Sequence, residues 1–197
     1  MGGCYSAAMS RRQSTLPSIW LVSDARNDAA LEQILRKLPR GSGLIFRHYH
    51  LDPAERRHRF AQLKRLARSR GHTVALSAST AEVRRWGADA AYGPPRSLAK
   101  GFAMLRLVTA HSLREIGAAH RACADAIMLS PAWPTRSHPG QIALGPVKFR
   151  LLAARALVPV IALGGMNARR AQQLKAPRWA GIDGLCDKPT RQISKDS

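Results

Sequence analysis

Cysteine is scarce in this chain of 197 residues, which has only Cys4, Cys123 and Cys186. The three lie far apart and form no C-x-x-C pair, so the sequence indicates neither a zinc site nor a disulfide framework. Long apolar runs are also missing, because Pro, Gly or Arg interrupts each hydrophobic segment within a few positions. We therefore expect a soluble, cytoplasmic protein with no membrane partner.

Acidic residues are few as well: 12 Asp and Glu stand against 32 Lys and Arg, for a formal net charge of +20. Such an excess suits a polyanion partner when the basic residues cluster. Here they are spread along helical stretches such as 56–70, and the aromatic residues, 6% of the chain, do not interleave with them. We predict no specific nucleic-acid partner, and nucleic-acid binding is kept as the competing hypothesis.

What the sequence does contain, from Ile19 onwards, is a regular alternation of short apolar runs with longer amphipathic stretches. This pattern is typical of repeated strand–helix units around a parallel sheet. Helix starts are predicted at Asp52-Pro53 and at the caps Asn27, Ser112 and Asn167. Strand-like runs occur at 19–24, 43–50, 73–78, 90–93, 105–110, 126–130, 158–165 and 181–186.

Eight such units predict a single (β/α)8 TIM barrel. The alternative is a doubly wound sheet, which would usually carry a glycine-rich phosphate turn after its first strand, whereas S-D-A-R-N-D at 23–28 has no glycine. We place the barrel at residues 17–187. Residues 1–16 are expected to be a disordered tail or the product of a misplaced start codon, and residues 188–197 a flexible tail.

In such a barrel the carboxyl ends of the strands meet at one mouth, where the fold places its sites. The residues at those ends are mostly basic or carry hydroxyl groups, with Asp24 as the one evident carboxylate. This composition suits a phosphate better than a metal held by carboxylates, so no metal-binding residue is predicted. The candidate site residues are Arg47, Thr109, His111, Ser130, Thr135, Ser137, His138, Gly164 and Gly165.

The L-G-G-M turn at 163–166 is the most specific signal in this set. Glycines between a strand and a helix let backbone N–H groups approach a phosphate, although a tight turn that needs positive φ explains them equally simply. Thr135 and Ser137 could donate hydroxyl hydrogen bonds to the same anion.

Two further candidates each have a structural alternative. Arg47 could bind an anion or form an ion pair with Asp24 across the mouth. His111 could make a local hydrogen bond to the backbone or transfer a proton. His48 should point away from Arg47, because side chains alternate along a strand.

In their order, these motifs resemble the thiamine-phosphate synthase family, whose relatives include the thiazole tautomerases. The resemblance covers nearly the whole chain from I-W-L-V-S-D at 19–24, and it is strongest in T-A-H-S at 109–112, A-D-A-I-M-L-S-P-A-W-P-T-R-S-H at 124–138 and P-V-I-A-L-G-G-M at 159–166. It implies a βα barrel that joins an aminopyrimidine pyrophosphate to a thiazole phosphate, with Mg²⁺ holding the pyrophosphate. By position it assigns active-site roles to Arg47, Thr109 and His111, and phosphate binding to Thr135, Ser137, Gly164 and Gly165.

The chain departs from the family pattern where the pyrophosphate would lie. Ile45 and Tyr49 stand where Gln and Lys are expected, and S-A-S-T at 77–80 replaces an Asn-Asp pair. Y-G-P-P at 92–95 lacks the metal-binding Asp, and His138 replaces a Lys of the catalytic loop. Mg²⁺ is therefore expected, if at all, only as an ion that arrives with the substrate.

Three functions stay open at this point. The first is a thiamine-phosphate synthase, in which Arg47, His111 and His138 are the catalytic candidates. The second is a metal-independent isomerase of the tautomerase type that uses His111 or His138. The third is a barrel that has lost catalysis and only binds a phosphorylated ligand. In each case the expected partners are small thiazole or pyrimidine phosphates, and the sequence favours no particular oligomeric state.

Overall fold

The structure is a computed structural model that describes residues 16–98, 104–135, 140 and 142–185. Its strands follow one another in chain order around a closed parallel barrel, and the eighth strand pairs with the first. The predicted single (β/α)8 barrel is confirmed. The strands are β1 (Ile19–Val22), β2 (Gly43–Phe46), β3 (Thr73–Leu76), β4 (Ala90–Gly93), β5 (Leu105–Ala110), β6 (Ala126–Leu129), β7 (Val160–Ala162) and β8 (Trp179–Gly181).

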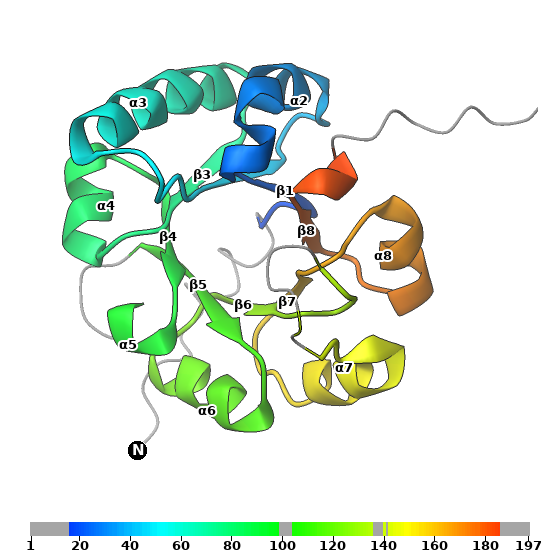
Figure 1. The fold of residues 1–197 in the computed structure, drawn as a ribbon. Helices are drawn as coiled ribbons and strands as arrows, with labels where there is room; N and C mark the ends of the chain where they lie inside the picture. The colour runs from blue at the N-terminus through cyan, green and yellow to red at the C-terminus, as the bar shows by residue number, and fades with distance from the viewer. Residues whose placement is uncertain (1–15, 99–103, 136–139, 141, 186–197) are drawn as a thin grey trace, which may run out of the picture.

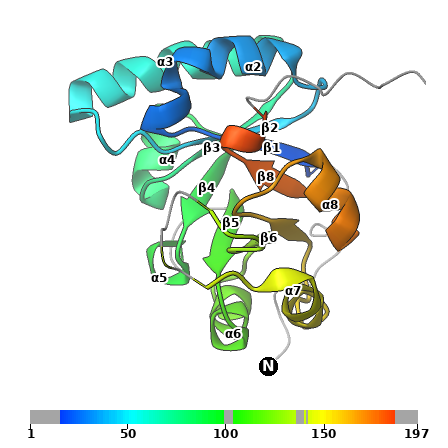
Figure 2. The ribbon, with the colours of Figure 1, turned by 45° about the vertical axis from the view of Figure 1, so that its right-hand side comes forward.

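Helices form a ring outside the strands, as Figure 1 shows in a view along the barrel. Figure 2 shows the same ring obliquely, with two of these helices, residues 31–37 and 53–69, side by side. No helix of the described residues is long and apolar enough to cross a membrane. In chain order the helices are η1 (Ala25–Ala30), α2 (Leu31–Lys37), α3 (Pro53–Ser69), α4 (Thr80–Trp86), α5 (Pro95–Leu98), α6 (Leu113–Arg121), α7 (Gly145–Ala153), α8 (Ala168–Leu174) and η2 (Asp183–Leu185), η1 and η2 being 3-10 helices.

Strand side chains alternate between two hydrophobic layers, because successive residues of a strand point to opposite faces. Along β1, Leu21 packs in the layer between strands and helices, whereas Trp20 and Val22 belong to the separate cluster that fills the barrel. The strand residues of this inner cluster are Trp20, Val22, Ile45, Ala75, Ala90, Tyr92, Leu107, Ala126, Met128, Ile161 and Ala180.

Trp20 fills the amino end of the barrel interior. Its side chain is fully buried, and its indole Nε1 donates a hydrogen bond of 2.9 Å to the carbonyl oxygen of Pro17. Its partner across the β1–β2 ladder is Gly43, where an added Cβ would lie 2.1 Å from the indole ring. The large side chain on one strand therefore requires a glycine on the next.

Most predicted helix starts are confirmed: Asp52, Ser112 and Asn167 cap α3, α6 and α8 by accepting backbone N–H groups. The predicted cap at Asn27 is wrong. Asp24 caps η1, and Asn27 lies inside η1 and donates to the carbonyl oxygen of Val22.

The eighth strand is displaced from its predicted position at 181–186. It runs from Trp179 to Gly181, where Trp179 packs in the outer layer and Ala180 in the inner one. Residues 183–185 form η2 instead, because Asp183 and Gly184 cannot continue the apolar alternation.

Candidate functional site

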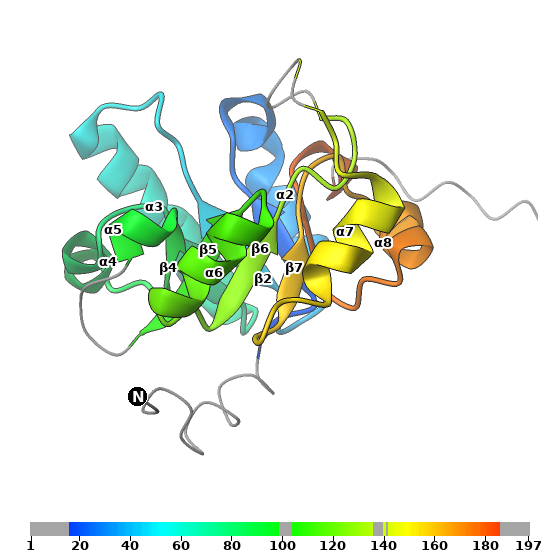
Figure 3. The same ribbon diagram turned by 90° about the horizontal axis from the view of Figure 1, so that it is seen from below.

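A cavity of about 420 Å³ lies at the carboxyl ends of the strands. Figure 3 views the barrel from the side and shows the described part of the loop after β6 at the same end as η2. Strand alternation explains the lining, because the residue two positions beyond an inward-facing core residue again points inward. The side chains that line the cavity from the strand ends are Arg47, Ser77, Tyr92, Thr109, His111, Ser130 and Leu163.

Most of the predicted site residues come together at this cavity. Ser137 and His138 lie outside the described residues. The predicted residues that line the cavity are Arg47, Thr109, His111, Ser130, Thr135, Gly164 and Gly165.

Tyr92 also lines the cavity. Burial raises the pKa of Tyr92 to about 12, so its phenol stays neutral and forms part of the wall.

The two glycines form a tight turn after β7. Gly164 has φ 92° and Gly165 has φ 60°, a region that side chains disfavour. A Cβ on Gly164 would lie 2.8 Å from Cα of Pro131, and one on Gly165 would lie 2.4 Å from the carbonyl oxygen of Pro134. The turn therefore needs glycine for its backbone conformation and for its contact with the loop after β6.

Hydrogen bonds fix this turn but leave its N–H groups unused. The guanidinium of Arg170 donates to the carbonyl oxygen of Gly165, so the N–H of Met166, on the same planar trans peptide, points the opposite way. The side chain of Asn167 accepts from the N–H of Arg170 at 2.9 Å. Gly164, Gly165 and Met166 line the cavity, and their N–H groups make no hydrogen bond with another described residue.

His111 has a defined ring orientation. Its Nδ1 lies 2.8 Å from the carbonyl oxygen of Ser130 and 3.2 Å from the hydroxyl of the same residue. Because a carbonyl only accepts hydrogen bonds, Nδ1 carries a proton, and the neutral ring has Nε2 as its basic nitrogen. That Nε2 has no hydrogen-bond partner among the described residues. The local hydrogen bond is thus present, and it holds the ring in the tautomer that could accept a proton at the cavity.

Arg47 is not paired with Asp24. Asp24 forms an ion pair of 2.8 Å with Arg26, which also contacts Asp183 at 3.2 Å. Burial raises the pKa of Asp24, but the hydrogen bonds and charge of Arg26 outweigh burial and hold that pKa below its usual value of 3.8. The guanidinium of Arg47 makes no ion pair with a described residue and lines the cavity.

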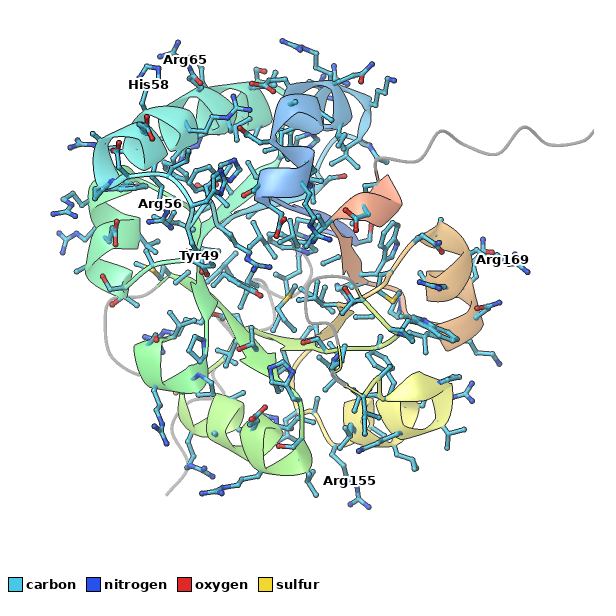
Figure 4. All side chains as sticks on the ribbon, viewed as in Figure 1. Tyr49, Arg56, His58, Arg65, Arg155 and Arg169 are labelled. Atoms are coloured by element: carbon cyan, nitrogen blue, oxygen red, sulfur yellow. The ribbon has the colours of Figure 1, made fainter. Side chains whose placement is uncertain are left out.

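Tyr49, Ser77 and Arg56 form a connected group at the ends of β2 and β3. The hydroxyl of Tyr49 is hydrogen-bonded to that of Ser77. Arg56 on α3 donates to the carbonyl oxygens of Arg47, at 3.0 Å, and Ser77, at 2.8 Å. Figure 4 shows Arg56 on the α3 and α4 side of Tyr49. Arg56 thereby joins the two strand ends beneath the cavity.

His48 points away from the cavity, as predicted. It is buried and stacks on Phe46 with 4.6 Å between ring centroids. Its Nδ1 lies 2.7 Å from the hydroxyl of Ser23, and its Nε2 lies 2.7 Å from Asp28. Since the hydroxyl of Ser23 also accepts the N–H of Arg47 at 2.8 Å, this chain of hydrogen bonds fixes the backbone of Arg47.

Asp183 and Arg170 also line the cavity, although neither was predicted from the sequence. The prediction that Asp24 is the carboxylate of the mouth is wrong, because the side chain of Asp24 caps η1 and the carboxylate that lines the cavity belongs to Asp183. The signal for Asp183 was its position shortly after β8, but the displaced strand prediction put it inside the strand.

The described side chains of this site offer few ligands for a metal ion. Among the described residues no group of three His, Cys, Asp or Glu side chains could hold a metal ion. The hydroxyl of Ser77 is hydrogen-bonded to Tyr49, and Pro94, in the Y-G-P-P segment that lacks the metal-binding Asp of the family pattern, offers no side-chain ligand. The described residues of this cavity do not fit Mg²⁺ as an ion bound by the protein itself.

Comparison with known proteins identifies the family and the fold of the chain. The sequence model of the thiamine monophosphate synthase family matches residues 19–186. The fold resembles thiamine phosphate pyrophosphorylase from Pyrococcus furiosus, with 18% identity, a TM-score of 0.72 and coverage of 87% of this chain and 88% of that one. The corresponding protein from Bacteroides thetaiotaomicron shares 16% identity at a TM-score of 0.57, with coverage of 92% and 90%.

Barrels of other enzymes are also similar in fold. The YdjI aldolase from Escherichia coli K12 has 7% identity and a TM-score of 0.61, with 90% of this chain and 80% of that chain covered. No curated protein matches the sequence. At these identities the similarity to solved structures shows the fold alone, so the match to the family model carries the assignment.

Proposed function

We propose, since the chain belongs to the thiamine monophosphate synthase family, that it joins a thiazole phosphate to an aminopyrimidine pyrophosphate. The observation that carries the proposal is the turn at 164–166, which lines the cavity and whose N–H groups have no hydrogen-bond partner among the described residues. Fixed backbone donors of this kind bind phosphate oxygens. Thr135, at the same cavity, adds a hydroxyl beside them.

In this reaction the bond between the pyrimidine methylene carbon and the pyrophosphate oxygen breaks, and pyrophosphate leaves with the electron pair. The lone pair of the thiazole nitrogen then forms the new carbon–nitrogen bond. Arg47 would bind the leaving pyrophosphate, because its guanidinium lines the cavity and forms no ion pair with a described residue, whereas the guanidinium of Arg170, which also lines the cavity, donates to the carbonyl oxygen of Gly165. A positioned cation stabilises the charge that develops there.

Mg²⁺ would have no protein carboxylate to bind in the described part of this site, since the acid at the cavity, Asp183, is paired with Arg26. Any Mg²⁺ in the reaction would therefore come with the substrate pyrophosphate. Arg47 must then contribute more to stabilising the negative charge of the leaving pyrophosphate than it would in a site where the protein itself binds the ion.

A second candidate function is a metal-independent proton transfer on a thiazole phosphate. It is favoured by His111, whose Nδ1 is held by Ser130 so that Nε2 is available as the base. Neither a metal nor a pyrophosphate site is needed for such an isomerisation. The phosphate would still be bound at the turn.

Incubation with both substrates, with Mg²⁺ or with a chelator, followed by chromatography for thiamine phosphate, tests the first proposal. We expect product from the unmodified protein, none from Gly165→Asp and much less from Arg47→Gln. Arg169→Gln is the matched control, because Arg169 points outward from α8 in Figure 4.

Absence of product, while calorimetry still shows thiazole phosphate binding, would exclude the synthase. The same samples then test the second candidate by solvent deuterium incorporation into a thiazole phosphate. Incorporation that His111→Asn abolishes would establish proton transfer, and no incorporation would leave ligand binding as the function.

A further inference from the structure

Tyr49 differs from every other large aromatic side chain of the described residues. It is 62% exposed, whereas the remaining exposed large apolar side chains are aliphatic. It lines the cavity beside Arg47 rather than lying on the outer surface. More than half of the surface of this residue is thus accessible at the cavity.

The ring of Tyr49 is also held in place. Its hydroxyl is bonded to Ser77, and the guanidinium carbons of Arg47 and Arg56 lie 5.5 and 5.8 Å from the ring centroid. Arg56 is fixed in turn by the carbonyl oxygens of Arg47 and Ser77 and by Glu82, 3.6 Å away. A side chain fixed at both its hydroxyl and its ring loses little entropy when a ligand binds to it.

Arg47 supplies the second element of the site. Its N–H donates to Ser23 and its carbonyl oxygen accepts from Arg56, so the backbone is fixed on both sides. Its guanidinium, unpaired among the described residues, therefore lies at a defined place next to the Tyr49 ring. Aromatic rings stack on tyrosine, and guanidinium groups bind anionic oxygens.

We infer that Tyr49 and Arg47 together form a subsite for a planar heteroaromatic ring that carries an anionic group, with the ring on Tyr49 and the anion on Arg47. Ser77 and Arg56 are positioning residues of this subsite. The inference rests on the proposed function in one respect, namely that an aminopyrimidine pyrophosphate is the ligand of this class.

Calorimetric binding of two probes in metal-free buffer tests the subsite. The probes are inorganic pyrophosphate, which has the anion alone, and aminopyrimidine pyrophosphate, which adds the ring. We expect the unmodified protein to prefer the ring-bearing probe by about fivefold to a hundredfold, the range that stacking on one aromatic side chain gives. Tyr49→Leu should abolish this preference, and Tyr49→Phe should keep most of it.

Arg47→Gln should weaken both probes and leave the ring preference in place. Because Tyr49 is largely exposed, its variants should stay folded, which thermal unfolding checks. The subsite is wrong if the unmodified protein shows no ring preference or binds neither probe, or if Tyr49→Leu keeps the preference. An equal loss for both probes in Tyr49→Leu would also overturn it, since Tyr49 would then act only by supporting Arg47.

The outcome is separable from that of the proposed function, because no product is measured. A ring preference without thiamine phosphate formation would retain the subsite and exclude the synthase. Product formation without a ring preference would support the synthase and overturn the subsite.

Discussion

Gly165 combines two constraints that any side chain would violate. Its φ of 60° is disfavoured for residues with a Cβ, and a Cβ would lie 2.4 Å from the carbonyl oxygen of Pro134. Gly71 has a similar φ of 71° but has no atom within 4 Å of an added Cβ. The two positions therefore separate backbone strain from the close contact.

We predict that Gly71→Ala lowers the free energy of unfolding by about 1–2 kcal/mol, the cost of a left-handed conformation. Gly165→Ala should lower it further and should also weaken thiazole phosphate binding, because the turn must move. Urea denaturation and calorimetry measure the two effects. Equal losses of stability with unchanged binding would show that the contact with Pro134 is unimportant.

His48 is a residue whose protonation makes the free energy of unfolding depend on pH. Desolvation by burial lowers the pKa of His48 below its usual 6.5 despite the hydrogen bond to Asp28. Asp28, whose hydrogen bonds to His48 and Arg59 hold its own pKa below the usual value, accepts from Nε2. The neutral ring with its proton on Nε2 makes both hydrogen bonds: Nε2 donates to Asp28, and Nδ1 accepts from the hydroxyl of Ser23.

A lowered pKa in the folded state means that the unfolded chain binds the proton more readily. The stability contributed by neutral His48 is therefore present above pH 6.5 and falls as the pH drops below it. We predict that His48→Gln flattens the pH dependence of the free energy of unfolding in this range, measured by urea titrations. His58→Gln on the exposed face of α3 is the control and should keep the slope of the unmodified protein.

At the scale of elements, the contact of Gly43 with Trp20 joins β1 to β2. No positive φ is involved at Gly43, so the effect of a side chain there comes from the contact alone. We predict that Gly43→Ala lowers the free energy of unfolding by about 1–3 kcal/mol, as overpacking does. Gly117→Ala in α6, where the nearest atom is 3.5 Å away, should instead stabilise by about 0.5–1 kcal/mol. Thermal and urea unfolding measure both.

The strand pattern was predictable because each strand is short, apolar and bounded by turn residues. Period-two alternation also placed Arg47 inward and His48 outward, as the structure has them. The eighth strand failed because Trp179 and Ala180 follow a polar stretch, while the apolar Leu185 suggested a later strand. Pairing with β1 and β7 decides that register.

At the scale of the whole molecule, the parts of the site that escaped prediction come from contacts between distant segments. Arg26 reaches from the loop after β1 to Asp183 beyond β8, and Arg56 reaches from α3 to the ends of β2 and β3. A strand-end rule finds residues that point into the barrel mouth. It does not find residues of the following helices that reach back, such as Arg170 of α8.

The excess of positive charge is distributed over the molecule. In the run at 56–59, Arg56 and Arg59 are engaged with protein groups, Arg59 with Asp28 and Glu32. Figure 4 shows Arg65, Arg155 and Arg169 pointing outward on separate sides of the barrel. These outward arginines of the described residues therefore do not lie on one face, as a surface that follows a phosphate backbone would require.

We therefore predict weak binding of random duplex DNA, single-stranded DNA and structured RNA alike, with dissociation constants of about 10⁻⁴ to 10⁻⁶ M at physiological salt and a steep loss as salt rises. Fluorescence polarisation at two salt concentrations measures this. Arg65→Glu and Arg169→Glu, on separate sides of the barrel, should each weaken binding slightly and by a similar amount, because scattered charges contribute independently. Sub-micromolar binding of one nucleic acid at physiological salt, lost through only one of these variants, would instead identify a dedicated surface. The competing hypothesis that this protein acts on nucleic acid would then replace the proposed reaction.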